Sequence, residues 1–146
     1  MAAKVQQSIT INQPIERVFA FLTDPTNTPK WQLNVLESKV MTEGPTRVGT
    51  RIIDVRSFLG RKIESTSEIT ELEPNKRLVF KSVSGPFPYK GTYSFESLGK
   101  ATRVTLDAEA EPKGFYKLAE GILAGGMKKQ LETDVAQAKQ LLESEA

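Results

Sequence analysis

The chain has 146 residues, of which 38% are hydrophobic, and it contains no His and no Cys. Its 20 basic and 18 acidic residues give a formal net charge of +2 and form no basic block, so we expect no nucleic-acid partner. The length predicts a single domain, 1–146, with a substantial core.

The missing residue types also limit the chemistry. Without His the chain lacks the usual general base at neutral pH and the commonest metal ligand, and without Cys it has no thiol nucleophile and no disulfide. A Ser-His-Asp or Cys-His site is therefore excluded, and we expect no metal and no cofactor. No apolar run is long enough to span a bilayer, and no apolar signal stretch begins the chain, so we expect a cytoplasmic protein without a membrane span.

The first 31 residues predict a strand followed by two short helices. Apolar and polar residues alternate from Val5 to Ile11, which is typical of a half-buried strand. A short helix follows, because apolar residues recur at its spacing: Ile15, Val18, Phe19 and Leu22. The Asp24-Pro25 pair ends this helix, and a second helical turn near Thr28 carries Trp31.

Six further strands follow, separated by turns that contain Gly or Pro. Their expected ranges are 36–41, 51–58, 61–72, 78–84, 89–97 and 102–110. Seven strands at this spacing, most of them joined by hairpins, predict one large antiparallel sheet. Its apolar face needs a cover.

The last third of the chain predicts a long helix from residue 115 that supplies this cover. One apolar stripe consists of Phe115, Leu118, Ala119, Ile122 and Leu123. A second stripe consists of Met127, Leu131, Val135, Ala138 and Leu142. At about 100° per residue the two stripes are offset by roughly 140°, and Gly125-Gly126 lies where they meet. We therefore predict a bend or local unwinding at this glycine pair; the alternative is that the glycines allow close backbone packing.

Several motifs carry a resemblance to a known family. They are the run from Ile11 to Trp31, Val48-Gly49-Thr50, the segments 92–95 and 102–105, and Lys113-Gly114. With these residues the chain resembles the polyketide cyclase/dehydrase-like group of the START-related SRPBCC superfamily. The resemblance implies an α+β helix-grip fold: a seven-stranded antiparallel curved sheet with two short helices after strand 1 and a long C-terminal helix. It also implies a deep, mainly apolar cavity between the sheet and that helix.

Strand alternation predicts which side chains face this cavity. The expected inward residues are Ile53 and Val55; Ile63, Ser65, Ser67 and Ile69; Leu78, Phe80 and Ser82; Tyr89, Gly91, Tyr93 and Phe95; and Val104, Leu106, Ala108 and Ala110. Asp54, Arg56 and Glu64 are expected on the solvated outer face, so the inner face is apolar and aromatic with a few hydroxyl groups. Arg51 shares the parity of Ile53 and is the expected inward exception.

The candidate ligand-binding residues combine these faces with the helices and one loop. They are Trp31, Ile53, Val55, Ile63, Ser65, Ser67, Phe80, Ser82, Phe87, Tyr93, Phe95, Leu106, Leu118, Ile122 and Met127. The alternative for the aromatic residues among them is plain core packing. Phe87 is on a stiff Gly-Pro-Phe-Pro loop that either frames the cavity mouth or forms an ordinary turn.

Three functions remain open at this point. The first is binding of a small, largely apolar molecule such as a lipid, quinone or polyketide-like compound, by a monomer or homodimer. The second is a cyclase or dehydratase, with Tyr89 or Tyr93 as an acid and Arg51 as an oxyanion partner. The third is a protein-interaction module with a filled interior. An empty apolar space of ~300 Å³ would cost about 7 kcal/mol, so a ligand, water or side chains should fill it.

Overall fold

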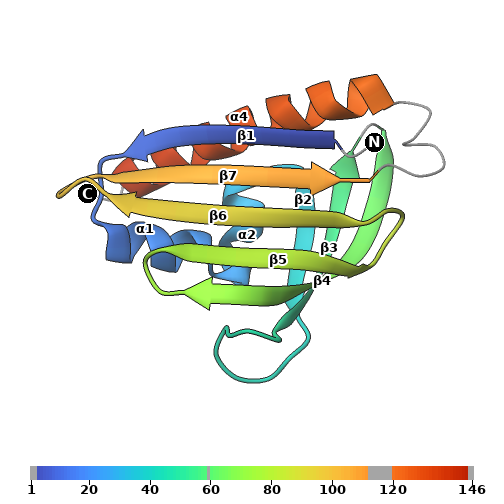
Figure 1. Cartoon of the computed structure of the whole chain (residues 1–146), viewed down its shortest axis with the longest axis horizontal. Helices are drawn as coiled ribbons and strands as arrows, with labels where there is room; N and C mark the ends of the chain where they lie inside the picture. The colour runs from blue at the N-terminus through green and yellow to red at the C-terminus, as the bar shows by residue number, and fades with distance from the viewer. Residues whose placement is uncertain (1–2, 59, 112–119, 145–146) are drawn as a thin grey trace.

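The computed structural model describes residues 3–58, 60–111 and 120–144, which form one sheet and its helical cover (Figure 1). In chain order the elements are β1 (Ala3–Ile11), α1 (Ile15–Leu22), the 3₁₀ turn η1 (Pro25–Asn27), α2 (Thr28–Trp31), β2 (Val35–Val40), β3 (Arg51–Phe58), β4 (Arg61–Glu73), β5 (Arg77–Ser84), β6 (Tyr89–Ser97), β7 (Thr102–Ala110) and α4 (Glu120–Ser144). The strands agree with the predicted ranges to within two residues. The predicted start of the last helix, 115–119, lies outside the described residues.

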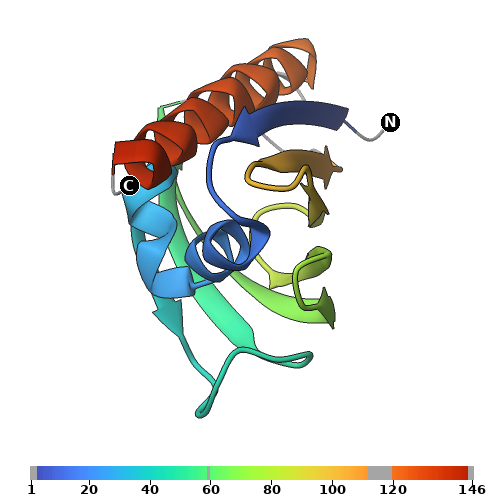
Figure 2. The same cartoon turned by 90° about the vertical axis from the view of Figure 1, so that its left-hand side faces the viewer.

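The seven strands form one antiparallel sheet in the order β1-β7-β6-β5-β4-β3-β2. Each strand from β2 to β7 pairs with the next along the chain, and β1 pairs with β7. The connection from β1 to β2 therefore crosses from one edge of the sheet to the other. It does so through α1, η1 and α2, which lie inside the curve of the sheet (Figure 2). This is the α+β helix-grip arrangement that the sequence predicted.

The hydrophobic core lies where the C-terminal half of α4 meets β1, β6, β7 and the short helices. Its buried residues are Ile11, Val18, Leu22, Trp31, Phe95, Val104, Leu106, Val135, Ala138 and Leu142. The α4 members of this core, Val135, Ala138 and Leu142, follow helical spacing and belong to the second predicted stripe. The C-terminal half of α4 thus packs into this main core, and Ala124 and Met127 of its N-terminal half pack against a smaller cluster with Ala3 and Ile63.

Polar contacts fasten the same end of α4 to β1 and the turn that follows it. The Lys139 Nζ atom donates a 2.7 Å hydrogen bond to the Thr10 carbonyl and lies 2.6 Å from the Glu143 carboxylate. That carboxylate accepts a 2.8 Å hydrogen bond from the Asn12 backbone N–H. The Gln13 side-chain amide donates to the Leu142 carbonyl at 2.9 Å. These bonds give the last two turns of α4 a fixed position against the chain entering α1.

The predicted break in the last helix is wrong, because α4 runs without interruption through Gly125 and Gly126 (Figure 2). The offset between the two apolar stripes is resolved in another way. Val135, Ala138 and Leu142 of the second stripe are buried, whereas Ile122, from the first, is 67% exposed. A Cβ atom built on Gly125 would meet nothing within 4 Å, so close packing does not require this glycine either.

We therefore expect Gly125→Ala to stabilise the fold by up to about 1 kcal/mol, since alanine favours a helix interior over glycine by that amount. Urea-induced unfolding of the two proteins measures the difference. Gly91→Ala is the matched control and has the opposite expectation, because a Cβ on Gly91 would overlap the ring of Phe80. Destabilisation by Gly125→Ala would show that this position needs the freedom of glycine.

Candidate ligand-binding site

A cavity of about 150 Å³ lies between the inner face of the sheet and the N-terminal half of α4. Strand alternation supplies its apolar wall, and α4 supplies its cover. The apolar residues that line it are Ile63, Phe80, Phe87, Leu106, Ala108, Ala110, Met127 and Leu131. The polar residues that line it include Gln32, Asn34, Arg56, Ser65, Tyr89, Tyr93, Gln130 and Asp134.

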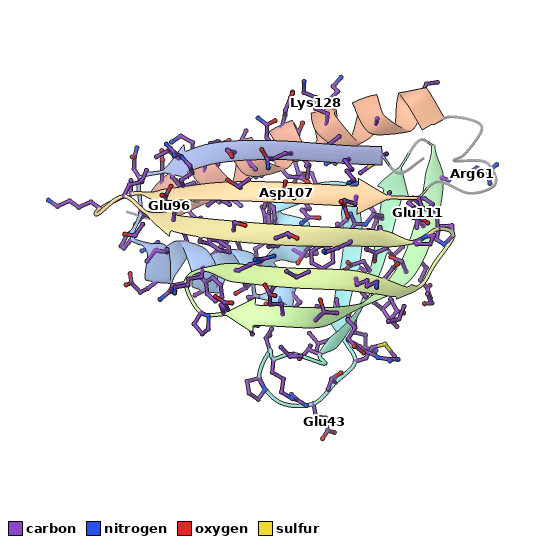
Figure 3. The ribbon with its side chains drawn as sticks, in the orientation of Figure 1. Glu43, Arg61, Glu96, Asp107, Glu111 and Lys128 are labelled. Atoms are coloured by element: carbon purple, nitrogen blue, oxygen red, sulfur yellow. The ribbon has the colours of Figure 1, made fainter. Side chains whose placement is uncertain are left out.

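The inward faces of β4, β6 and β7 are those that alternation predicted. On β4, Ile63, Ser65 and Ser67 are all buried, and each has an inward partner on a neighbouring strand. Tyr93 faces Leu106 across the β6–β7 pair. Charged side chains of the opposite parity cover the outer face, as Asp107 does over the middle of β7 (Figure 3).

The prediction of which β3 side chains face inward is wrong, because the inward-facing positions are shifted by one residue. Asp54 pairs with Ser65 and Arg56 pairs with Ile63, so Asp54 and Arg56 share the inner face with the lining of β4. The predicted inward residues Ile53 and Val55 pair with Thr66 and Glu64 and face outward. The cause is that two apolar residues are adjacent at positions 52 and 53, so counting apolar residues favours the wrong face.

Arg51 is consequently also on the outer face. Its Nε atom lies 3.0 Å from the Glu68 carboxylate, in an ion pair whose arginine is about half exposed. The predicted inward role of Arg51, and its role as an oxyanion partner, are therefore wrong. Arg56 is the arginine that lines the cavity.

A hydroxyl cluster surrounds Tyr89 at one side of the cavity. The Ser65 and Tyr89 hydroxyl groups share a 2.9 Å hydrogen bond, and the Tyr89 backbone N–H donates to Ser82 Oγ at 2.9 Å. Burial raises the pKa of Tyr89, while the bond to Ser65 and the charge of Arg56 act in the opposite direction. Tyr89 therefore stays protonated and can donate a hydrogen bond to a bound molecule.

Tyr93 is held deeper, between two other rings. Its ring makes edge-to-face contacts with Trp31 and Phe80, with centroids 5.7 Å and 5.5 Å away. The Gln32 side-chain amide donates a 2.9 Å hydrogen bond to the Tyr93 hydroxyl oxygen. Burial raises the pKa of Tyr93 far above its ordinary value, so this hydroxyl is neutral.

Three charged side chains reach the interior, which corrects the expectation of an almost uncharged cavity. The Arg56 guanidinium lies 3.3 Å from Asp54 Oδ2, and Asp134 of α4 is only 2% exposed. The Gln130 amide donates a 2.8 Å hydrogen bond to Asp134 Oδ1. Burial raises the pKa of Asp134 to about 7, against the opposing effects of Gln130 and of the positive charge of Arg56.

Helical spacing contains a signal for Asp134 that the sequence analysis missed. Asp134 follows Leu131 by three residues and precedes Ala138 by four, so it lies on the same stripe as the core residues of α4. A carboxyl group on the inward stripe of an amphipathic helix is unusual enough to mark a site. No comparable pattern identifies Gln32 or Arg56.

The structure places the other predicted residues differently from one another. Ile63, Ser65, Phe80, Phe87, Tyr89, Tyr93, Leu106 and Met127 line the cavity. Trp31 and Phe95 belong to the core, Ser67 lines a smaller second cavity, and Ser82 supports Tyr89 from behind. Ile122 is exposed, which contradicts an inward role, and Leu118 lies outside the described residues. The residues that the structure describes hold no cluster of His, Cys, Asp or Glu able to bind a metal ion.

The arrangement of sheet and helices defines a helix-grip protein, and comparison with known families agrees with this fold. The chain belongs to the family described as "Polyketide cyclase / dehydrase and lipid transport", whose model matches residues 2–143. A comparison with curated proteins finds no match. Within the described ranges no helix is long and apolar enough to cross a membrane.

Solved structures share the fold over nearly the whole chain. The protein TTHA0849 of Thermus thermophilus has a TM-score of 0.85 at 24% identity, covering 98% of this chain and 99% of its own. The Zhui aromatase/cyclase of Streptomyces sp. R1128 has a TM-score of 0.83 at 15% identity, with coverages of 98% and 94%. A START superfamily protein of Mycobacterium smegmatis has a TM-score of 0.82 at 12% identity, with coverages of 98% and 99%. At these identities the likeness establishes the fold alone.

The raised pKa of Asp134 predicts a pH-dependent stability. Between about pH 4 and pH 7 the unfolded chain loses a proton that the folded chain keeps at Asp134, so the free energy of unfolding falls as the pH rises through this window. A difference of about three pH units corresponds to at most roughly 4 kcal/mol. Asp134→Asn should remove this loss, and its advantage over the native chain should grow between pH 4 and pH 7 in urea unfolding.

Glu132→Gln, at an exposed position of the same helix, is the matched control and should leave the pH profile unchanged. Parallel profiles for Asp134→Asn and the native protein would contradict an elevated pKa at Asp134.

Proposed function

We propose that the chain binds a small, largely apolar molecule of about the size of one aromatic ring, carrying at least one polar group, in the cavity between the sheet and α4. The observation that carries this proposal is the composition of the lining. Its walls are apolar and aromatic, and Arg56, Tyr89 and Asp134 offer a few polar groups among them. Ligand pockets in proteins have this character.

The energetics of the cavity support the same proposal. At ~24 cal/mol per Å³, an apolar space of 150 Å³ would cost at most about 4 kcal/mol if it were closed and dry, a large part of the ~5–15 kcal/mol stability of a domain. An apolar cavity of about 150 Å³ is known to be large enough for benzene. A bound ring would recover much of this free energy.

The lining also favours this function over an interaction module. That hypothesis requires an interior filled by side chains, and a cavity of about 150 Å³ argues against it. Membership of a family described by both cyclase/dehydrase activity and lipid transport is compatible with a bound hydrophobic molecule.

Filling the cavity should weaken ligand binding. Ala108→Leu places three more carbon atoms in the lining of β7, whereas Thr105→Leu introduces the same side chain on the outer face of the same strand. Single-ring aromatics and small quinones should raise the Tm of the native protein and of Thr105→Leu by mass action. Ala108→Leu should lose at least about tenfold in affinity, measured by calorimetric titration.

If Ala108→Leu and Thr105→Leu bind these ligands with equal affinity, the ligand binds outside this cavity. No stabilisation by any apolar class, and no co-purifying mass in native mass spectrometry, would contradict the binding function itself.

A second function, cyclase or dehydratase catalysis, is favoured by one observation. Asp134 has a pKa of about 7 and lines the same cavity as Arg56. A group that titrates near neutral pH can give or take a proton during a reaction, and an arginine can stabilise a developing oxyanion. Arg56 takes the place that the sequence analysis gave to Arg51, and the protonated Tyr89 hydroxyl is the candidate acid.

If this function holds, Asp134→Asn should lower kcat on a polyketide-like poly-β-ketone by roughly 10²–10⁴-fold. Binding of a ring-sized ligand should be retained, because the volume of the side chain is unchanged. Tyr89→Phe and Tyr93→Phe test the two tyrosines separately, and unchanged turnover would exclude the corresponding role. Steady-state kinetics between pH 5 and pH 9 provide the measurement.

A further inference from the structure

A second, smaller cavity of about 50 Å³ lies behind the first, between the short helices and the strands β3, β4 and β5. Leu22, Pro25 and Thr28 line it from the helical side, and Ser67 and Ile69 from the sheet. We call this space the rear chamber.

Four side chains separate the rear chamber from the main cavity. Gln32, Arg56, Phe80 and Tyr93 belong to the linings of both, so they form a shared partition. Two polar contacts hold this partition: the 2.9 Å hydrogen bond from Gln32 to Tyr93, and the 3.3 Å ion pair between Arg56 and Asp54. Since the partition consists of side chains rather than backbone, a slender group can pass it after modest rotations.

The lining of the rear chamber includes two buried oxygen atoms without a hydrogen-bond partner among the residues that the structure describes. They are Asp54 Oδ1 and Ser38 Oγ, and Asp54 as a whole is 9% exposed. Ser38 and Asp54 are direct partners across the β2–β3 pair, so the two atoms come from neighbouring positions on one face. A buried polar atom without a partner costs about 1–3 kcal/mol, and more if it is charged.

The chemistry of these atoms restricts what can satisfy them. A carboxylate oxygen only accepts hydrogen bonds, whereas a serine hydroxyl donates and accepts. The group that fits must therefore donate an O–H or N–H. An anion would be repelled by Asp54, and a cation would compete with Arg56, which already pairs with the other Asp54 oxygen. A neutral donor remains.

We propose that the rear chamber binds the hydroxyl end of a neutral aromatic alcohol whose ring occupies the main cavity. The inference rests on the proposed binding function and specifies its ligand class. About 10–15 Å³ is needed for each water molecule, so without a ligand the rear chamber has room for a few waters. The ligand hydroxyl replaces one of them at Asp54 and Ser38.

Two probes of matched shape test this assignment. 3-Phenylpropan-1-ol and butylbenzene differ by a hydroxyl in place of a methyl group, and Kd is measured for each by calorimetric titration. The two probes differ in hydration, but this difference is the same for every protein variant. It therefore largely cancels when the ratio of the two Kd values is compared between variants. Ser38→Ala and Asp54→Asn should each shift this ratio against the alcohol by about tenfold, with little change for butylbenzene.

Thr66→Ala, on the outer face of β4, is the control and should leave the ratio unchanged. Ser38 lies on the edge strand β2. If Asp54→Asn fails to fold, the Kd ratio measured for Ser38→Ala decides the question. If butylbenzene binds and the ratio is the same in every variant, the rear chamber holds only water and the inference is overturned while the binding function stands. If neither probe binds the native protein, both are overturned.

A crystal structure with 3-phenylpropan-1-ol provides an independent criterion. The expected result is a ligand oxygen within hydrogen-bond distance of Asp54 Oδ1 and Ser38 Oγ. A hydroxyl directed to the cavity mouth would refute the assignment.

Discussion

The structure depends on how α4 is held against the open side of the sheet. Its C-terminal half is packed and bonded: Val135, Ala138 and Leu142 are buried, and Lys139 ties the helix to β1. Close packing at one end fixes the direction of the whole helix, because a continuous helix transmits that direction along its length. The N-terminal half, in which Ala124 and Met127 pack near Ala3 and Ile63, continues across the curved sheet and covers the cavity.

The sequence predicted the fold well because the pattern that sets the fold is redundant. Ile63, Ser65, Ser67 and Ile69 alternate with polar residues along β4, so the inward face is specified several times over. The site was predicted less well, because β3 has only weak alternation: the Ile52-Ile53 pair fits either face. Residue type also does not distinguish a side chain packed in the core from one that borders a cavity, which is why Trp31 belongs to the core rather than to the lining.

The charged residues of the interior explain why choosing the inward residues of β3 by their apolar character gave the wrong face. A buried charge is costly unless it is paired, and Asp54 and Arg56 are paired with each other on adjacent inward positions of one strand. Removing one partner would leave the other as a buried charge without a counter-ion, whereas replacing both by apolar residues would not. A pair whose burial gives little or no net stability is not required by the fold alone, which is compatible with the proposed binding function. The unpartnered second oxygen of Asp54 agrees with that view.

Binding and turnover differ here by the use of a single proton. The chain contains no His, and among the described residues Asp134 is the group whose pKa is raised to near neutrality. Well below pH 7 Asp134 is neutral, and Asp54 and Arg56 are paired with each other, which suits a neutral apolar guest. Near pH 7 the same carboxyl group exchanges its proton readily, which suits catalysis. The burial that would admit an apolar ligand therefore also raises the pKa of Asp134 toward the range that an acid–base reaction would need, so the two proposed functions would share one physical cause.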